Sequence, residues 1–232
     1  FAGIGGFRIP FDELGGECVF TSEFDKFSQI TYEENFGEKP SGDITKIDEK
    51  DIPSHDLLLG GFPCQAFSNA GLKRGFQDTR GTLFFDIARI LKHHKPKAFI
   101  LENVKGLKSH DNGNTLDVIV NTLNEMSYNL FIEVLNAKNF GLPQNRERIF
   151  IVGLKDHLDF IFPEPSFKKT RLGDILDRRN DDSFTISDRI WVSHQRRKEN
   201  ARAKGYGFGY SLFDEDSEYT STISARYYKD GS

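Results

Sequence analysis

The order of hydrophobic and polar positions predicts strands that alternate with helices up to about residue 154. Short, continuous apolar runs are typical of strands that are buried on both faces. Such runs occupy residues 18–21, 56–61, 98–101, 131–135 and 148–154. Apolar residues that recur at intervals of three and four predict amphipathic helices over residues 83–94 and 115–126.

Two further helices are expected near the start of the chain. One covers residues 7–14 and is followed by a pair of glycines. Asp25 can cap the other, and Gly37 can end it. The residues expected to face the core from this second helix are Phe27, Ile30 and Phe36. Strands alternating with helices indicate an α/β fold, with a mostly parallel sheet covered by helices on both faces.

The alternating pattern stops after Leu154. Pro163 and Pro165 mark a linker, and the residues beyond them are polar, then basic, then rich in glycine and aromatic residues. We therefore expect one domain over residues 1–160, and a linker with part of a smaller domain over residues 161–232.

Composition narrows the class of protein. The 232 residues suffice for one α/β domain and a piece of a second. The two cysteines, Cys18 and Cys64, are too few for a disulfide framework or a cysteine-based zinc site, and we expect no metal. The apolar runs are too short to span a bilayer.

The net charge of −4 is unevenly distributed. Residues 1–72 hold five Lys or Arg against thirteen Asp or Glu, whereas residues 168–204 hold eleven against six. The basic segment suits a polyanionic partner, and a solvated helix face is the simpler alternative.

Several polar groups are expected at the carboxyl ends of the strands, where parallel sheets bind ligands. The loop that contains Gly3 and Gly5 can bring backbone amides close to a ligand, or can form a plain tight turn. Glu23 could accept hydrogen bonds from ribose hydroxyls, and Asp43 could bind an adenine amino group; the alternatives are an exposed carboxylate and a turn aspartate. Together these features favour a cofactor that contains a nucleoside.

Two other features carry reactive groups. Cys64 follows a strand and two glycines; it could be a buried apolar residue, but its polar, positively charged loop argues for a functional thiol. Glu102 ends the run at residues 98–101, and Arg146 precedes the last strand. They could form a structural ion pair or belong to a site that binds an anionic substrate.

Four segments, at residues 1–6, 61–68, 102–104 and 144–148, resemble the successive motifs of the DNA (cytosine-5)-methyltransferases. The likeness includes their order and spacing, and is strongest to the bacterial restriction-modification enzymes. It implies a Rossmann-like sheet of the S-adenosylmethionine-dependent methyltransferases and part of a target-recognition domain. The family's first strand, which precedes Phe1, and its later motifs are expected to be missing.

The resemblance implies that S-adenosylmethionine is the cofactor and that S-adenosylhomocysteine is the product. Glu23 would hold the ribose, Asp43 would bind the adenine amino group, and Phe24 and Ile44 would flank the ring. The other implied cofactor contacts are Phe1, Ala2, Gly3, Gly5, Gly6, Pro63 and Leu83.

The same resemblance assigns the chemistry. Cys64 would add to C6 of a cytosine that has left the duplex, and Glu102 would stabilise or supply a proton at N3. Arg146 would orient Glu102 and the base, and Arg148 would support them. Water is the expected base for the C5 proton.

The implied partner is duplex DNA. Candidate contacts to it are Gln65, Ser68, Arg80 and Thr222. A restriction-modification enzyme is expected to act beside a cognate restriction system without a stable complex, in the bacterial cytoplasm at the nucleoid. We expect a monomer, or a second chain that supplies the missing motifs.

Two other functions are considered. A tRNA cytosine-5 methyltransferase usually carries a Cys-Phe-Thr tripeptide in its recognition region, and this sequence has none there. A catalytically silent DNA-binding relative would not need Cys64, Glu102, Arg146 and Arg148 together.

Overall fold

The computed structural model describes residues 1–63, 83–155, 158–177, 185–207 and 209–222. The chain forms two compact units. Residues 1–135 and 147–163 make up the first, and residues 136–146 and 164–232 the second. The segment 136–146 therefore groups with the second unit although it precedes the last long strand of the first.

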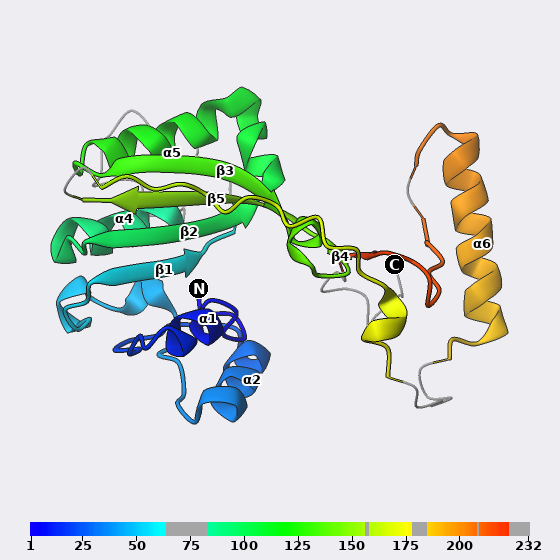
Figure 1. The fold of residues 1–232 in the computed structure, drawn as a ribbon, viewed down its shortest axis with the longest axis horizontal. Coiled ribbons are helices and arrows are strands. Elements are labelled where there is room, and N and C mark those ends of the chain that lie inside the picture. The colour runs from blue at the N-terminus through cyan, green and yellow to red at the C-terminus, as the bar shows by residue number, and fades with distance from the viewer. Residues whose placement is uncertain (64–82, 156–157, 178–184, 208, 223–232) are drawn as a thin grey trace. The chain divides into compact units, whose positions relative to one another are not determined.

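The first unit contains a four-stranded sheet in the order β1-β2-β5-β3 (Figure 1). The strands are β1 (Leu57–Gly61), β2 (Ala98–Val104), β5 (Glu147–Leu154) and β3 (Asn129–Asn136). β1 and β2 run parallel, and Gly61 lies opposite Glu102. β5 runs antiparallel to β2, whereas β1, β2 and β3 run in one direction in Figure 1, so the sheet is mostly parallel with one reversed strand. A continuous apolar run does not record the direction of its strand, so the sequence pattern could not reveal this.

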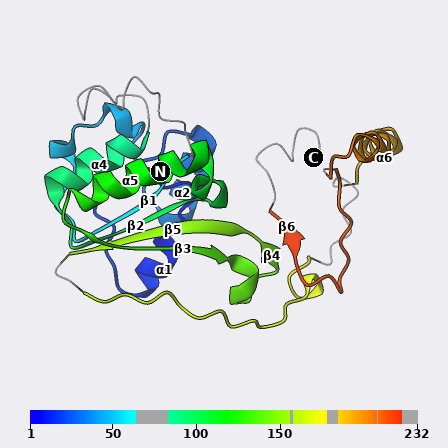
Figure 2. The same cartoon turned by 90° about the horizontal axis from the view of Figure 1, so that it is seen from above.

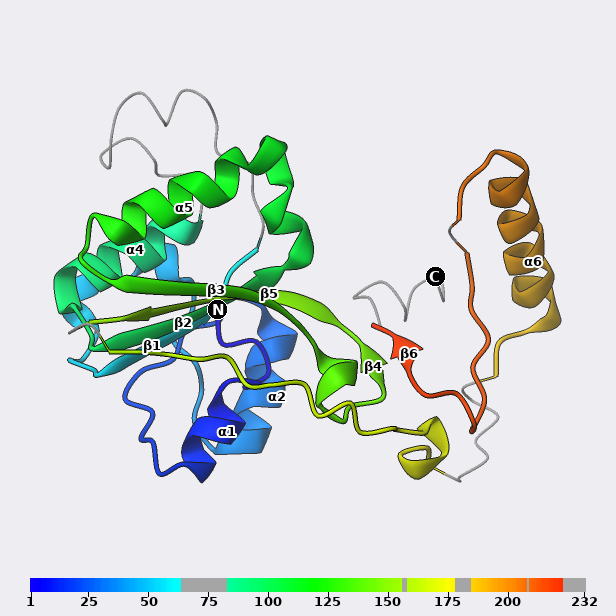
Figure 3. The same cartoon turned by 45° about the horizontal axis from the view of Figure 1, so that its top comes forward.

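Two long helices cover one face of this sheet. Figure 3 shows α4 (Leu83–His94) and α5 (Asn114–Asn124) on the same side of the strands. Their apolar stripes join one core cluster with inward residues of β2 and β5, including Phe99, Leu101 and Ile151. Helix α4 has the bounds that the apolar spacing predicts, and α5 matches to within two residues.

Helices α1 (Arg8–Glu13) and α2 (Lys26–Phe36) lie beyond β1 (Figure 1). The predicted signals of α2 are confirmed: Asp25 accepts a hydrogen bond from the Ser28 amide, 2.8 Å away, and Gly37 adopts a left-handed φ of 71°. The predicted inward face is right for Phe36, which is half-buried against Gly5, and wrong for Phe27 and Ile30, which are exposed. The buried side chain of α2 is that of Tyr32, a polar aromatic residue that the apolar spacing passes over.

The strand expected at residues 18–21 is also wrong. The structure assigns no strand there, and the pairing beside it is the single bridge between Ser22 and Ser41. The amide of Glu23 donates to the carbonyl of Ser41 at 2.9 Å, and that of Ala2 donates to the carbonyl of Ser22 at 3.0 Å. These bonds bring three distant stretches of chain side by side, although they are too few to form a ladder.

The second unit has little regular structure among its described residues. Strands β4 (Gln144–Asn145) and β6 (Thr220–Ser221) pair in parallel, and both are labelled in Figure 2. For comparison, the described part of the first unit contains four 3₁₀ helices, at Ile44–Lys46, Glu49–Asp51, Lys105–Lys108 and His110–Gly113. The 3₁₀ helices of the second unit are Ala137–Phe140 and Leu172–Asp174, and its one long helix in the described part is α6 (Asp188–Ala203). None of the helices in the described ranges is long and apolar enough to cross a membrane.

Candidate functional site

Glu23 is a nearly buried carboxylate held by backbone amides. Its side chain is 10% exposed. Oε2 accepts a hydrogen bond from the Gly3 amide at 2.9 Å, and Oε1 accepts from the amides of Phe24 and Asp25 at 3.0 Å each. A carboxylate offers about four lone-pair positions, so this geometry fixes the group and leaves it able to accept another donor. The sequence indicated the acid but not the three amides that hold it.

The glycine-rich loop packs tightly against α2. Gly3 has a φ of 58° and Gly5 a φ of 95°, in the region that favours glycine. A Cβ built on Gly5 would lie 2.1 Å from Cε2 of Phe36, so no larger residue fits there without a shift. Gly6, by contrast, has nothing within 4 Å of such an atom. The loop is therefore fixed by contact at Gly5 and by the Glu23 bond at Gly3.

The other predicted cofactor residues divide into buried and exposed ones. The side chains of Phe1 and Leu83 pack against one cluster that contains the buried Ile44. Phe24 is 71% exposed, and Pro63 is also exposed. The structure thus brings Phe1, Ile44 and Leu83 together, and leaves Phe24 beside Glu23 as a free aromatic face.

Asp43 caps the 3₁₀ turn Ile44–Lys46. Its Oδ1 accepts hydrogen bonds from the Thr45 hydroxyl at 2.8 Å and from the Thr45 amide at 3.1 Å. These bonds lower the pKa of Asp43 below its ordinary value. The second carboxylate oxygen forms a longer ion pair with Lys46, 3.9 Å away. The role predicted for Asp43 toward adenine stays a prediction.

Glu102 and Arg148 meet on neighbouring strands. The Nε atom of Arg148 lies 2.8 Å from Oε1 of Glu102, and the two side chains are 19% and 22% exposed. Glu102 comes from β2 and Arg148 from β5, two residues apart in the register of this antiparallel pair. A Cβ on Gly61 would lie 3.4 Å from Oε2 of Glu102, so the end of β1 also borders the carboxylate. The pair is partly desolvated and open to a small polar ligand.

The predicted Arg146 belongs to the second unit. Its backbone amide donates to Oδ1 of Asn136 at 3.1 Å, and its carbonyl accepts from the amide of Ala137 at 3.0 Å. Asn136 is a residue that the sequence reasoning missed; its only signal was its place at the end of an apolar run. Thr222 donates its hydroxyl hydrogen bond to the carbonyl of Asn145 at 3.1 Å. The predicted roles of Arg146 toward Glu102 and of Thr222 toward DNA stay predictions.

Four predicted residues lie outside the described residues. They are Cys64, Gln65, Ser68 and Arg80. Their assigned roles therefore rest on the resemblance.

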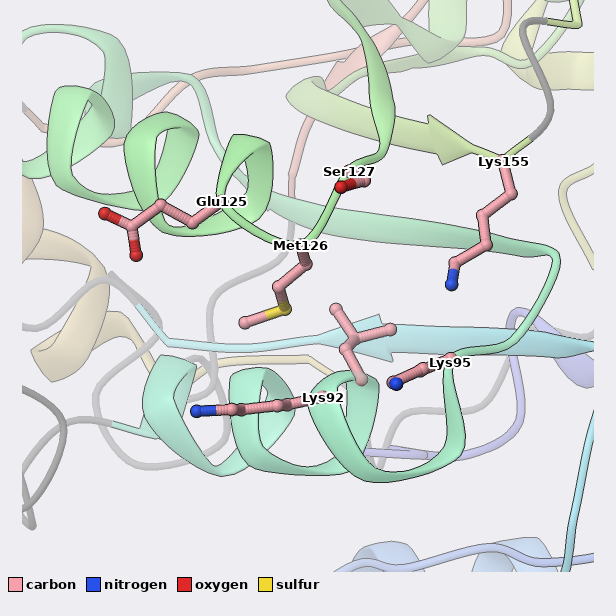
Figure 4. Close-up of a pocket in the computed structure, with 7 residues that line it drawn as sticks. Lys92, Lys95, Glu125, Met126, Ser127 and Lys155 are labelled. Carbon is pink, nitrogen blue, oxygen red and sulfur yellow. The ribbon is translucent and has the colours of Figure 1, made fainter.

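A separate hollow of about 380 Å³ lies near the opposite end of β2. It is lined by Lys92, Lys95, Glu125, Met126, Ser127 and Lys155, as Figure 4 shows, together with Leu91. Lys155 follows the end of β5, and its amide bonds to the carbonyl of Lys97 just before β2 begins. This hollow contains none of the predicted site residues. In the ranges that the structure describes, no cluster of His, Cys, Asp and Glu could hold a metal ion.

The fold and site define an α/β protein with a buried carboxylate held by backbone amides and an acid–arginine pair on the two inner strands of its sheet. The chain belongs to the C-5 cytosine-specific DNA methylase family, whose model matches residues 1–232. This membership agrees with the resemblance carried by the sequence motifs.

Named relatives are similar over the whole chain. It is 60% identical to the Type II methyltransferase M1.ScrFI of Lactococcus lactis subsp. cremoris, over 100% of this chain and 61% of that protein. It is also 60% identical to the Type II methyltransferase M.SsoII of Shigella sonnei, over 100% of this chain and 63% of that protein. The chain thus spans less than two thirds of the length of these relatives.

Solved structures share the fold. The crystal structure of the S. pombe Dnmt2 methyltransferase superposes with a TM-score of 0.73 at 18% identity, covering 98% of this chain and 70% of the other. The structure of the Entamoeba histolytica methyltransferase EhMeth gives a TM-score of 0.71 at 18% identity, covering 99% and 70%.

Proposed function

We propose that this chain is the catalytic part of an enzyme that transfers a methyl group from S-adenosylmethionine to C5 of cytosine in duplex DNA. The observation that carries the proposal is the Glu102–Arg148 pair, with Nε and Oε1 2.8 Å apart, beside Gly61, which precedes Cys64 by three residues in the sequence. Family membership and the Type II methyltransferase relatives support the choice of reaction.

The cofactor residues fit a nucleoside. Glu23 is rigidly held and retains capacity to accept hydrogen bonds from ribose hydroxyls. Phe24 offers an exposed aromatic face next to it. Asp43 directly precedes the buried Ile44, whose side chain anchors this turn in the core. S-adenosylmethionine, when bound, supplies an electrophilic methyl group. Phe1, Ala2, Gly3, Gly5, Gly6, Pro63 and Leu83 would complete the pocket.

The proposed chemistry begins with the protein's thiolate. Cytosine C5 is a weak nucleophile, so Cys64 adds to C6 and makes C5 electron-rich. Glu102 holds a proton at N3 of the base as charge develops, and Arg148 keeps its carboxyl group oriented through the 2.8 Å contact. Arg146 would orient Glu102 and the base O2. C5 would take the methyl group that bound S-adenosylmethionine supplies, which leaves S-adenosylhomocysteine. Water would then remove the C5 proton, and the thiolate would leave from C6 as the C5–C6 double bond re-forms.

The reacting base has to leave the duplex, because C6 is inaccessible to a thiol inside the stack. Gln65, Ser68, Arg80 and Thr222 are proposed to contact DNA around the extruded base. The basic segment over residues 168–204 would contact phosphates, which contributes affinity without sequence specificity. A cognate restriction enzyme would act on the same DNA site without binding this chain.

The test is methyl transfer by the purified protein from radiolabelled S-adenosylmethionine to duplex DNA and, in parallel, to tRNA. We expect label in 5-methylcytosine of DNA only, and Cys64→Ser should abolish it. Transfer to tRNA alone would reject the proposed substrate. Transfer to neither, with cofactor binding intact, would support a silent DNA-binding relative.

A separate variant, Glu23→Gln, tests the proposed cofactor pocket. Glu23→Gln places an amide NH₂ among three backbone donors, so we expect about tenfold weaker binding of S-adenosylmethionine by calorimetry. Glu102→Gln is the matched control, since it changes a carboxylate at the other end of the site and should leave this affinity unchanged. Equal affinities for Glu23→Gln and the unaltered protein would remove Glu23 from the cofactor pocket.

A further inference from the structure

Asn103 is a buried polar side chain next to the proposed acid. It is 2% exposed and lies on β2 directly after Glu102. Its Nδ2 donates to the carbonyl of Phe62 at 2.9 Å, and its Oδ1 accepts from the amide of Val104 at 2.8 Å. Burial of an amide is costly unless both its donor and its acceptor are satisfied, and here both bond to backbone.

The hydrogen bond from Asn103 fixes the backbone of Phe62, which follows the last residue of β1 and precedes Cys64 by two residues. The amide of Phe62 also donates to the carbonyl of Glu102, at 3.3 Å. The ring of Phe62 is buried 5.8 Å from that of Phe84 in the core. Both polar groups of the Phe62 backbone and its side chain are therefore held by β2 and α4.

We propose that Asn103 is a positioning residue, whose amide fixes where the Cys64 loop leaves β1 relative to the Glu102 carboxylate. The inference rests on the proposed function. Cys64 follows Phe62 by two residues, a reach of at most about 7 Å, so a change in the direction of the Phe62 carbonyl is passed on to the thiol. A misplacement of about 1 Å at a reacting group costs roughly 10²-fold in rate.

Two variants separate the donor from the rest of the side chain. Asn103→Ala removes the donor and the acceptor together. Asn103→Asp keeps the shape and the acceptor for Val104, but sets a carboxyl group against the Phe62 carbonyl. An ionised carboxylate repels that oxygen, whereas a protonated one donates to it.

The measurement is the rate at which the purified protein forms a covalent complex with duplex DNA that contains 5-fluorocytosine, with S-adenosylmethionine present. For Asn103→Ala we expect a loss of about 10²-fold, with affinities for DNA and cofactor within about threefold of the unaltered protein. For Asn103→Asp, the rate divided by that of the unaltered protein at the same pH should rise as the pH is lowered from about 8 to about 6. The same ratio for Asn103→Ala should stay flat.

Each other outcome counts against a defined claim. If the unaltered protein forms no complex although it binds DNA and cofactor, the proposed function falls, and this inference with it. If it does, a rate for Asn103→Ala within about threefold of it overturns the positioning role. Equal losses in binding and rate, or failure of both variants to fold, would show that Asn103 holds the fold and would also overturn the role. If only Asn103→Ala fails to fold, the pH ratio of Asn103→Asp decides.

Discussion

Replacing Arg148 with methionine removes the guanidinium whose Nε lies 2.8 Å from Oε1 of Glu102. An exposed ion pair contributes about 0–1 kcal/mol, and breaking a fully buried one costs about 3–5 kcal/mol. These side chains are 19% and 22% exposed, between those limits. We therefore expect Arg148→Met to lower the free energy of unfolding by about 1–3 kcal/mol.

A double-mutant cycle isolates the pair. Glu102→Gln keeps an oxygen that can accept from Arg148, so it should destabilise less than Arg148→Met, and the coupling between the two changes should be about 1–2 kcal/mol. Urea unfolding followed by circular dichroism measures both, with equal m-values as the check on comparable unfolded states. Both variants should lose methyl transfer by about 10²-fold or more, Arg148→Met because the carboxyl group is no longer oriented and Glu102→Gln because the carboxyl group is gone.

Lys97→Met is the matched control for Arg148→Met. Its Nζ lies 2.9 Å from Oδ1 of Asp56, at nearly the same separation, but both side chains are about four-fifths exposed (79% and 81%). Solvent screens such a pair, so this change should be much smaller. Unfolding free energies within about 0.5 kcal/mol for Arg148→Met and the unaltered protein, with unchanged turnover, would refute the reasoning.

Two further predictions concern the framework of the cofactor side. Gly5→Ala should lower the unfolding free energy by about 2–4 kcal/mol, because the φ is 95° and the new Cβ would lie 2.1 Å from the ring of Phe36. Gly6→Ala, with open space around the new Cβ, should change the unfolding free energy little. Equal melting temperatures for the two variants would contradict this reasoning. Asp25 has its pKa lowered chiefly by the hydrogen bond from the Ser28 amide. Its stabilisation is therefore fully present above about pH 4 and is lost as the pH falls through the lower folded-state value; in an acid titration of helix content, Asp25→Asn should lack that loss, and an unchanged curve would count against the cap.

The sequence predicted the elements whose signals are local. The bounds of α2 follow from Asp25 and Gly37, and those of α4 from its apolar spacing. The direction of β5 was not predictable, because a continuous apolar run is the same for either direction. The inward face of α2 was mistaken at Phe27 and Ile30, because the helix packs through Phe36 and through Tyr32, whose ring and hydroxyl group both find partners.

The candidate site was predictable where chemistry is carried by rare residue types. Glu23, Glu102 and Arg148 were identified as two acids and a cation next to apolar runs, and the structure places the last two in contact. The roles of Asn103 and Asn136 were not predictable, since these residues bond to the backbone of Phe62 and of Arg146 in distant segments. Such contacts depend on the register of the sheet, which a single sequence does not specify.

The most direct test of the proposed reaction is the identity of the residue that bonds to the substrate. The protein would be incubated with S-adenosylmethionine and duplex DNA that carries 5-fluorocytosine, and the trapped complex would be digested and analysed by mass spectrometry. We predict that the modified peptide contains Cys64 and that Cys18 stays unmodified. Attachment at any residue other than Cys64, or methylation of ordinary DNA without a trapped complex, would contradict the proposed mechanism.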